Sequence, residues 1–272
     1  MSSLLSTPAR VGIFDSGVGG LSVLRALRSA LPDQRFHYIA DSGHAPYGDR
    51  DGEHVVERSL RITDHLVAQG ARLVVVACNT ATAWAIETLR ARHPDLPLVG
   101  IEPGVKPAAA LSRNRRIGVL ATPATLASQR FDRLVARHAQ DCDVIRVPCP
   151  GLAAAIERGE AGRPAADALL DRYCSELRQA DVDTVVLGCT HYPFVAENIS
   201  ARLAPGVTLM DTADAVARQA LVLHRQAGWP GDVAPDLIAP TVLLQTTGER
   251  QTLERLAQDG LGLRQAAEFV AV

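Results

Sequence analysis

The strictest constraint on the fold is a regular alternation of short apolar runs with longer segments of helical periodicity. We predict buried strands at residues 11–15, 36–40, 73–77, 98–101, 117–121, 144–147, 184–188 and 241–245. Helical periodicity marks residues 21–31, 55–69, 81–93, 124–138, 164–179, 212–226 and about 249–258. Parallel strands need a crossover that is usually a helix, so this alternation predicts an α/β fold with mostly parallel sheets.

Two strand ends in the first half of the sequence have counterparts in the second half. Residues 10–16 resemble residues 116–122, and the apolar run that ends in Cys78 resembles the run that ends in Cys189. The two offsets, 106 and 111 residues, are nearly equal, and the order is preserved. We therefore expect two similar α/β domains with the active site in the cleft between them. The first would comprise residues 11–99 and 212–272 and the second residues 100–211, after a disordered lead-in at residues 1–10.

The composition argues against several classes of protein. A formal net charge of −2 gives no general attraction for nucleic acid or for an anionic membrane. No apolar run approaches the roughly 18–20 residues that span a bilayer. The first ten residues lack a signal-peptide core, so we expect a cytoplasmic protein. The five cysteines are odd in number and include no CxxC pair, which argues against disulfides or a zinc ribbon and favours reduced thiols.

Cys78 and Cys189 each follow a predicted strand and precede a segment that leads into a helix. Ligands of open α/β sheets bind at the carboxyl ends of the strands, so both thiols should face the site. The helix after Cys78 should lower the pKa of that thiol, because a helix N-terminus favours thiolate. One such cysteine is usually an inert buried thiol. Two at equivalent positions can remove a proton from one face of a carbon and return one to the other face, as racemisation requires.

A glycine-rich loop, Asp15-Ser-Gly-Val-Gly-Gly20, lies between the first predicted strand and the first predicted helix. It lacks the GK[ST] of a phosphate loop and the GxGxxG spacing of a dinucleotide site, so a nucleotide ligand is disfavoured. Asp15 could pair with a substrate ammonium, while Ser16 and the backbone N–H groups of the loop could bind a carboxylate. A substrate that carries both charges is an amino acid.

Two further segments contain polar residues whose role the pattern alone leaves open. The loop that begins at Asp41 follows the second predicted strand, and it is either a simple turn or a third loop of the site. His191 lies two residues after Cys189, where it could be structural or could tune that thiol.

Four segments together resemble the signature segments of bacterial glutamate racemases. They are residues 11–22, 45–48, 77–80 and 187–193, in the family's order and with similar spacing. The resemblance extends from about residue 11 to residue 248 and implies membership of the cofactor-independent aspartate/glutamate racemase superfamily. Proteins of that family have two α/β domains around the active site, use no cofactor or metal, and supply D-glutamate for peptidoglycan synthesis, hence for cell-wall biogenesis and cell shape. The resemblance leaves a homodimer open.

The resemblance also implies roles for individual residues. Cys78 would deprotonate D-glutamate and Cys189 L-glutamate, assisted by Asp15 and His191 respectively. The residues expected to bind the substrate are Asp15, Ser16, Tyr47, Gly48, Asn79, Thr80, Thr190 and His191. Asp41 and Glu157 match additional acidic residues of the site, although a glutamate on a helix surface is also an ordinary reading of Glu157. Glu102 departs from the family pattern, where many relatives have an apolar residue, so the role of the domain-linking segment stays open.

Several alternative functions are disfavoured by specific residues. A pyridoxal-phosphate racemase needs a Schiff-base lysine, and Lys106, the only lysine, lies between Pro103 and Pro107. A zinc hydrolase that uses Cys78, Cys189 and His191 lacks a ligand pair at recognisable spacing. A racemase for aspartate or hydantoin on the same scaffold remains open. An amino-acid-binding sensor without catalysis would have no need for both thiols.

Overall fold

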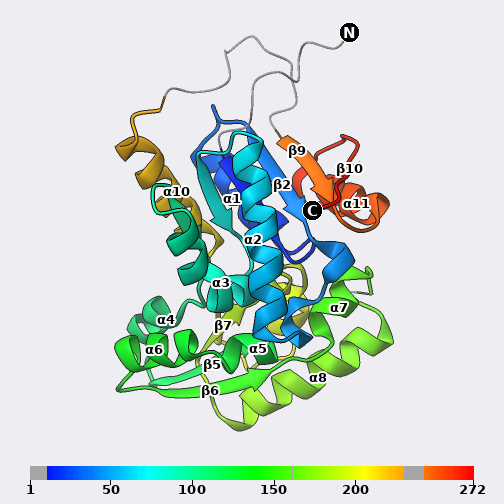
Figure 1. The fold of residues 1–272 in the computed structure, drawn as a ribbon. Coiled ribbons are helices and arrows are strands. Elements are labelled where there is room, and N and C mark those ends of the chain that lie inside the picture. The colour runs from blue at the N-terminus through cyan, green and yellow to red at the C-terminus, as the bar shows by residue number, and fades with distance from the viewer. Residues whose placement is uncertain (1–10, 161, 230–241) are drawn as a thin grey trace.

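The computed structural model describes residues 11–160, 162–229 and 242–272, which form two separate parallel sheets (Figure 1). The first sheet has the order β10-β9-β2-β1-β3-β4 and the second the order β6-β5-β7-β8, and every strand pairing is parallel. The strands of the first sheet are β1 (Val11–Asp15), β2 (Phe36–Ala40), β3 (Leu73–Val76), β4 (Leu98–Gly100), β9 (Val242–Thr246) and β10 (Glu268–Phe269). Those of the second are β5 (Arg116–Ala121), β6 (Asp143–Pro148), β7 (Thr184–Gly188) and β8 (Thr208–Met210). The predicted α/β class is confirmed.

The two sheets repeat one strand order. The series β2-β1-β3-β4 corresponds to β6-β5-β7-β8, so β1 corresponds to β5 and β3 to β7. These are the strands whose sequences resemble each other, and the resemblance therefore reflects a repeated topology. Strands β9 and β10 have no counterpart, and they extend the first sheet beyond β2. We call each sheet with the helices packed on it the first or the second lobe.

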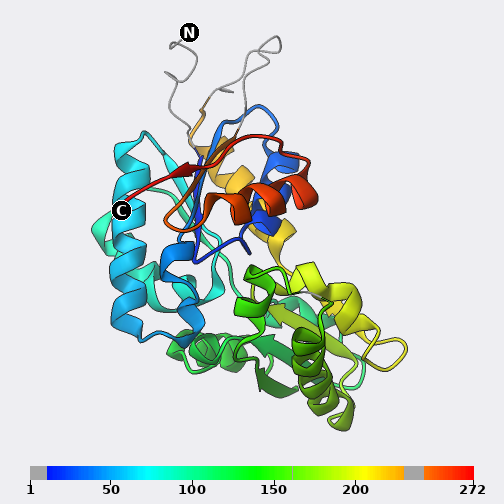
Figure 2. The same ribbon diagram turned by 90° about the vertical axis from the view of Figure 1, so that its right-hand side faces the viewer.

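Helices cover both faces of the first sheet (Figure 2). On one face α1 (Leu21–Ala30) packs against α10 (Ala213–Gln226) and α11 (Arg250–Leu261). On the other face lie α2 (Gly52–Ala68) and α3 (Asn79–Arg92). Because both faces are covered, β1, β2 and β3 are buried along their whole length, and their sequences are runs rather than alternations of apolar residues.

The second lobe has the same layered arrangement, and its helices other than α8 have at most ten residues. One core contains residues of α4 (Val105–Leu111), α5 (Pro123–Leu126) and α6 (Gln129–His138). The other contains residues of α7 (Leu152–Glu157), α8 (Pro164–Gln179) and α9 (Ala196–Ser200). Each fully buried leucine or isoleucine of such a core contributes about 1.5–3 kcal/mol.

The structure corrects one predicted helix. Residues 124–138 form two helices, α5 and α6, because Ser128 caps the second one. The Ser128 hydroxyl accepts a hydrogen bond from Phe131 N at 3.1 Å and donates one to Thr125 O at 2.7 Å. Such local bonds let a serine interrupt a helix that apolar periodicity alone would continue.

Some short elements were not predicted, and some predictions cannot be compared. The unpredicted elements are α4, α7, α9, β8, β10 and the 3₁₀ turns η1 (Ser42–His44), η2 (Tyr47–Asp49) and η3 (Tyr192–Val195). The predicted lead-in at residues 1–10 and the predicted strand start at Thr241 lie outside the described residues. In the described ranges, no helix is long and apolar enough to cross a membrane.

Candidate active site

A cavity of about 200 Å³ lies where the carboxyl ends of the strands of both sheets meet. Pockets that hold drug-sized ligands are usually about 300–1,000 Å³, so this one suits a small metabolite. Its lining residues are Ser16, Ser42, Ala45, Pro46, Tyr47, Gly48, Cys78, Asn79, Thr80, Thr122, Ala153, Ala154, Glu157, Arg158, Cys189, Thr190 and His191. Both lobes contribute to this wall, and each contributes one cysteine.

Cys78 stands between the end of β3 and the start of α3, where it caps the helix. Ala81 N donates to its Sγ at 3.5 Å, and the thiol lies 3.6 Å from Ser16 Oγ. The residue is 5% exposed, so most of its surface is shielded from solvent. The sequence prediction that Cys78 faces a cavity at a strand end agrees with this position.

The N-terminus of α3 acts to lower the pKa of Cys78, as predicted, but other causes outweigh it in this structure. Burial, and to a lesser extent the charge of Asp15, raise the pKa of the thiol to about 12. The hydrogen bonds from Ala81 N and with Ser16 act in the lowering direction but do not outweigh these two causes. A thiolate formed here is therefore scarce, and it is a strong base.

Cys189 stands at the equivalent end of β7 and is linked to two further side chains. Its Sγ lies 3.7 Å from His191 Nδ1, and His191 Nε2 lies 2.6 Å from Glu157 Oε2. Burial lowers the pKa of His191, but the bonds and charges of Cys189 and Glu157 outweigh it and raise that pKa well above its usual range. For Glu157 burial acts in the opposite direction and raises the pKa, but the hydrogen bond with His191 and the charge of His191 bring the pKa below its usual value. The two shifts describe a buried imidazolium–carboxylate pair beside the thiol.

The glycine loop after β1 is one of the surfaces on which the two lobes meet. A Cβ at Gly17 would lie 2.5 Å from a Glu157 oxygen, and one at Gly19 would lie 2.5 Å from His191 Nδ1. Real Cβ atoms essentially never approach so closely, so the glycines let side chains of the second lobe reach this backbone.

The loop does hold a carboxylate, but it belongs to the protein. Val18 N donates to Glu157 Oε2 at 3.0 Å, and Gly17 N donates to Asp15 Oδ1 at 2.8 Å. Our expectation that the backbone N–H groups of the loop bind a substrate carboxylate is therefore corrected for these two groups. Ser16 remains on the cavity wall.

Asp15 lies behind the cavity wall and does not line it. It is fully buried, and its Oδ2 accepts a hydrogen bond from Thr190 Oγ1 at 2.7 Å, which joins the two lobes. Burial raises the pKa of Asp15 to about 6, although His191, Thr190 and Gly17 N act to lower it. Asp15 is therefore placed to act on the cavity through its charge, next to both Cys78 and His191.

Unpartnered and mutually bonded polar groups line the rest of the cavity. Asn79 Nδ2 is buried and has no hydrogen-bond partner among the described residues. Thr80 of the first lobe lies 2.9 Å from Thr122 Oγ1 and 3.2 Å from Thr125 Oγ1 of the second. A buried donor without a partner costs about 1–3 kcal/mol, and a bound carboxylate would remove that cost.

The structure brings most of the predicted site residues together. Those that line the cavity are Ser16, Tyr47, Gly48, Cys78, Asn79, Thr80, Glu157, Cys189, Thr190 and His191. Asp15 and Asp41 do not line it, and Asp41 is fully buried with its oxygens bonded to neighbouring protein groups. Thr122 was missed, yet it occupies in the second repeat the position that Ser16 occupies in the first, so the repeat itself carried the signal.

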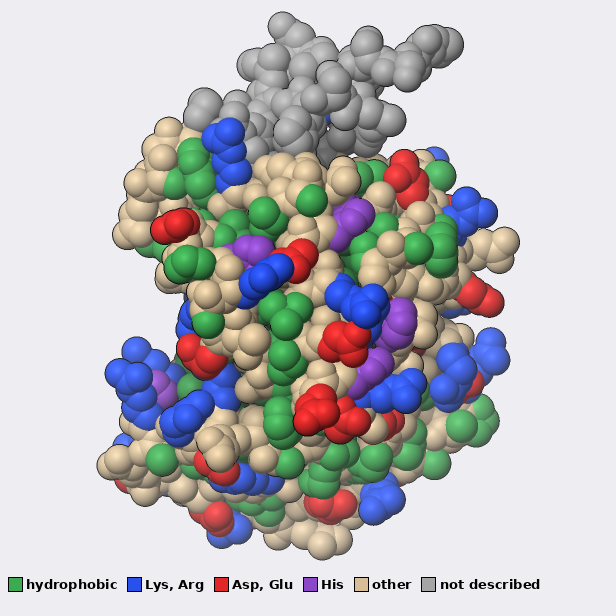
Figure 3. All heavy atoms as spheres, viewed as in Figure 1, with side chains coloured by type: hydrophobic (Ala, Val, Ile, Leu, Met, Phe, Trp, Pro, Cys, Tyr) green, Lys and Arg blue, Asp and Glu red, His purple; other side chains and the backbone are tan. Residues whose placement is uncertain are grey.

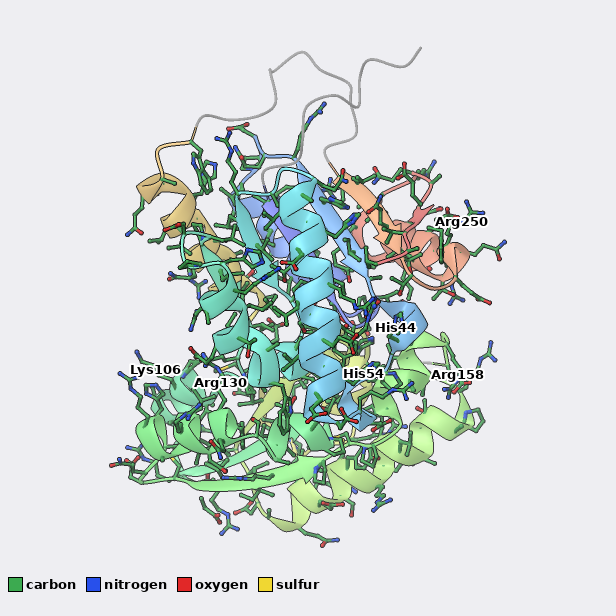
Figure 4. The ribbon with its side chains drawn as sticks, viewed as in Figure 1. His44, His54, Lys106, Arg130, Arg158 and Arg250 are labelled. Carbon is green, nitrogen blue, oxygen red and sulfur yellow. The ribbon has the colours of Figure 1, made fainter. Side chains whose placement is uncertain are left out.

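Two alternatives to thiol chemistry are a Schiff base on a lysine and catalysis by a bound metal ion. Lys106 is exposed on α4 and is not among the cavity-lining residues, and Figure 4 shows it across the molecule from Arg158. No group of three or more histidine, cysteine, aspartate or glutamate side chains suited to a metal ion occurs within the described ranges. On the face drawn in Figure 3, acidic and basic side chains are interspersed over both lobes.

Comparisons with known proteins give consistent results. The sequence profile of the Asp/Glu/hydantoin racemase family matches residues 20–220. The chain is 53% identical over 211 residues to a glutamate racemase of Ectopseudomonas mendocina, covering 78% of this chain and 80% of that protein. It is 50% identical over 264 residues to a glutamate racemase of Ralstonia pickettii, covering 97% and 92%. Its fold superposes with a TM-score of 0.82, at 33% identity and over 97% and 98% of the two chains, on Escherichia coli glutamate racemase in complex with L-glutamate and the activator UDP-MurNAc-Ala.

Proposed function

The chain belongs to the Asp/Glu/hydantoin racemase family, and relatives whose sequences are 50–53% identical to it are glutamate racemases. From this premise we propose that it interconverts L- and D-glutamate. The observation that carries the proposal is the presence of two thiols, Cys78 and Cys189, on the wall of one small cavity. They stand at corresponding strand ends of a repeated topology, one in each lobe. Two equivalent groups that approach one carbon from two lobes suit a reaction whose two directions are mirror images.

In the proposed reaction one thiol begins as thiolate and the other as thiol. The thiolate removes the α-proton, the C–H electron pair stays on the α-carbon, and the second thiol donates its proton to the opposite face. Cys78 would act on D-glutamate and Cys189 on L-glutamate. After one turnover the protonation states of the two thiols are exchanged, and no external acid or base is consumed.

The neighbours of the thiols support assisting roles for Asp15 and His191. The His191 imidazolium, held by Glu157, lies 3.7 Å from Cys189 Sγ, next to the sulfur that would take up or release the proton. Asp15 raises the pKa of Cys78 and so makes its thiolate more basic. Glu157 thus acts through His191.

The substrate would be held by the polar groups of the cavity wall. We assign its binding to Ser16, Tyr47, Gly48, Asn79, Thr80 and Thr190, with the unpartnered Asn79 Nδ2 donating to a carboxylate. A wall that pairs the side-chain carboxylate of glutamate would leave donors unpaired with aspartate, which is one methylene shorter. Such unpaired donors cost more than the about 1–3 kcal/mol of a methylene in an apolar pocket.

We also propose the wider setting of this activity. The exposed position of Lys106 and the chemistry of the thiols support catalysis without pyridoxal phosphate or a metal. The product D-glutamate would serve peptidoglycan synthesis in the cytoplasm. The two domains would divide the chain as predicted, at residues 11–99 with 212–272 and at residues 100–211, which is consistent with the composition of the two sheets.

Chiral analysis after incubation with L- or D-glutamate tests the proposal. The wild type should racemise either enantiomer without added cofactor, and it should do so much faster than it racemises aspartate. In D₂O, deuterium should appear early in the product enantiomer and hardly at all in recovered substrate. Comparable kcat/KM for aspartate would contradict the assignment to glutamate, and early label in recovered substrate would contradict two separate bases.

Single serine variants separate the two thiols from the other cysteines. Cys78→Ser and Cys189→Ser should each lose racemisation by several orders of magnitude, because a hydroxyl is a far weaker base than a thiolate. Cys142→Ser is the matched control, since Cys142 is only half-buried and lies outside the cavity. A Cys78 or Cys189 variant that kept more than about a tenth of the wild-type kcat, a barrier change under about 1.4 kcal/mol, would contradict the two-thiol mechanism.

A further inference from the structure

A buried ion pair outside the cavity connects five segments of the first lobe, one of them at Val272, whose O accepts a hydrogen bond from Arg58 Nη1 at 2.6 Å. Arg58, on α2, is 5% exposed and donates to both carboxylate oxygens of Asp41, from Nε at 2.9 Å and from Nη2 at 2.8 Å. The same carboxylate accepts hydrogen bonds from Tyr47 Oη at 2.5 Å and from Thr247 Oγ1 at 2.8 Å. His44 Nδ1 lies 3.0 Å from it.

The partners of Asp41 are parts of one cavity wall or lie against it. Residues 42–48 include Ser42, Ala45, Pro46, Tyr47 and Gly48, all of which line the cavity. Tyr47 is fully buried, and its hydroxyl is directed to Asp41. Thr247 also accepts a hydrogen bond from Gly43 N at 3.1 Å, so it holds the same loop from the side of β9. We call residues 42–48 the wall loop.

The wall loop has no long regular element of its own to hold it. It consists of two 3₁₀ turns, η1 and η2, and neither has a side-chain cap. Short 3₁₀ turns have poorer hydrogen-bond geometry than α-helices, so the position of the loop depends on its contacts with neighbouring elements. The Asp41 carboxylate is where the contacts from α2, from the loop and from the segment after β9 converge.

Arg58 determines the charge of that carboxylate. Burial acts to raise the pKa of Asp41, but the hydrogen bonds from Arg58, Tyr47 and Thr247 outweigh it and the pKa lies below its usual value. Without the guanidinium, Asp41 would be a buried carboxylate that lacks a counter-ion, a state that proteins avoid by protonating the group. A protonated Asp41 would be a weaker acceptor for the Tyr47 hydroxyl.

We propose that Arg58 is a positioning residue of the reaction, which fixes the wall loop through Asp41 and Tyr47 and thereby sets the affinity for glutamate. Arg58 does not line the cavity, so it touches neither substrate nor thiol. The loop contacts the substrate in the ground state and in the transition state alike, whereas the thiols stand on other segments. Loss of uniform binding of this kind raises KM and leaves kcat nearly unchanged. The inference rests on the proposed racemisation of glutamate.

The test is Arg58→Gln, measured by racemisation kinetics and by equilibrium binding of D-glutamate. We expect KM and Kd to rise together by at least tenfold, with kcat within threefold of the wild type. If Arg58 served only the stability of the fold, the variant would have a lower melting temperature, but KM and Kd of the folded protein would be those of the wild type. Arg61→Gln is the matched control, because Arg61 is on the same helix, is largely exposed and pairs only with Glu57 among the described contacts.

A double-mutant cycle tests the route through Asp41. If Arg58 acts through Asp41, then Asp41→Asn with Arg58→Gln should raise KM no further than the more severe single variant. The inference would be overturned if the increase of KM in the double variant equalled the product of the increases in the two single variants. Unchanged KM and Kd in folded Arg58→Gln would overturn it too. An inactive wild type would remove the proposed function, whereas an active wild type with an unaffected Arg58 variant would remove this inference alone.

A milder variant decides the question if Arg58→Gln does not fold. Thr247→Val keeps the ion pair and the side-chain shape but removes one hydrogen bond to Asp41 and one from Gly43 N. It should raise KM about threefold with little change in kcat. Wild-type KM in this folded variant would show that the network does not position the wall loop.

Discussion

Alkylation of Cys78 in the absence of substrate should increase with pH up to at least pH 10 without reaching a plateau. The structure raises the pKa of this thiol from 9.0 to about 12, chiefly by burial and then by the charge of Asp15. This shift corresponds to about 4 kcal/mol, at about 1.36 kcal/mol for each pKa unit. At pH 8 about one Cys78 in 10⁴ is then thiolate, against about one in ten for a thiol with a pKa of 9.0. Because thiolate is the reactive species but a more basic thiolate is also more nucleophilic, with a Brønsted slope of about 0.4–0.5, Cys78 should react about 30- to 60-fold more slowly than such a thiol.

The assay is site-resolved alkylation by iodoacetamide at pH 7–10, followed by mass spectrometry of the Cys78 peptide. Cys142→Ser should serve as the background, because Cys142 is the half-exposed cysteine of the described chain. The logarithm of the rate should rise with a slope close to one over the whole range. Asp15→Asn should speed alkylation at pH 8, since it removes a charge that raises the pKa of Cys78. A plateau near pH 8.5 would refute the reasoning and restore the helix N-terminus as the dominant influence on this thiol.

Three further changes have expected outcomes. Glu157→Gln removes the charged partner of His191, so kcat/KM should fall about 10- to 150-fold, the equivalent of one charge-assisted hydrogen bond of about 1.5–3 kcal/mol; a fall under threefold would show that His191 needs no carboxylate. The pKa of Asp183 is lowered to about 2. Burial acts to raise this pKa, but hydrogen bonds, including those that Ser112 Oγ and Asn114 N donate to the carboxylate, outweigh it. A carboxylate with a lowered pKa stabilises the folded state above its pKa in the unfolded chain, about 3.9, and this stabilisation is lost as the pH falls toward 2. In Asp183→Asn the free energy of unfolding should therefore fall less steeply between pH 4 and pH 2 than in the wild type. At pH 7 the substitution should cost about 1 kcal/mol, less than the full shift implies because solvent screens the group, and an unchanged slope over the acid range would contradict this. Dialysis against a chelator should leave racemisation unchanged, and dependence on a divalent ion would overturn the proposed chemistry.

Much of the fold could be predicted because the buried strands have a simple signature. Strands β1, β2 and β7 begin and end at the predicted residues, and so does α8. Each of these three strands is buried on both faces, and continuous burial requires a continuous apolar run. The repeat around the two cysteines also predicted the shared strand order, which a single apolar run could not reveal.

The errors arise where local hydrogen bonds override apolar periodicity. Ser128 divides one predicted helix into two through bonds to its own neighbours. Strand β8 has only three residues, none of them fully buried, and its apolar pair Leu209-Met210 is too short to predict a strand. The short helix α7 follows a glycine with a positive φ, Gly151, and its six residues are too few for helical periodicity to distinguish.

The sequence predicted which residues lie in the candidate site better than it predicted the pKa values of those residues. Motif residues from both halves line one cavity because strand ends collect at one edge of a parallel sheet. The pKa of Cys78 could not be predicted, because it depends on burial and on the distance to Asp15, which is the last residue of another strand, β1. For the same reason nothing in the sequence indicated that Arg58, in the middle of α2, would be the partner of Asp41.

The pairing of β9 with β2 has a consequence for synthesis of the chain on the ribosome. Phe36 lies opposite Val242, so the first sheet gains its outer strands only after about 200 further residues have been added. All four strands of the second sheet, residues 116–210, emerge during that interval. The second lobe can therefore fold on the nascent chain while β2 still presents an unpaired edge, and exposed edges of this kind are prone to aggregation. This order makes the period before β9 emerges the time at which the chain most needs protection by a chaperone.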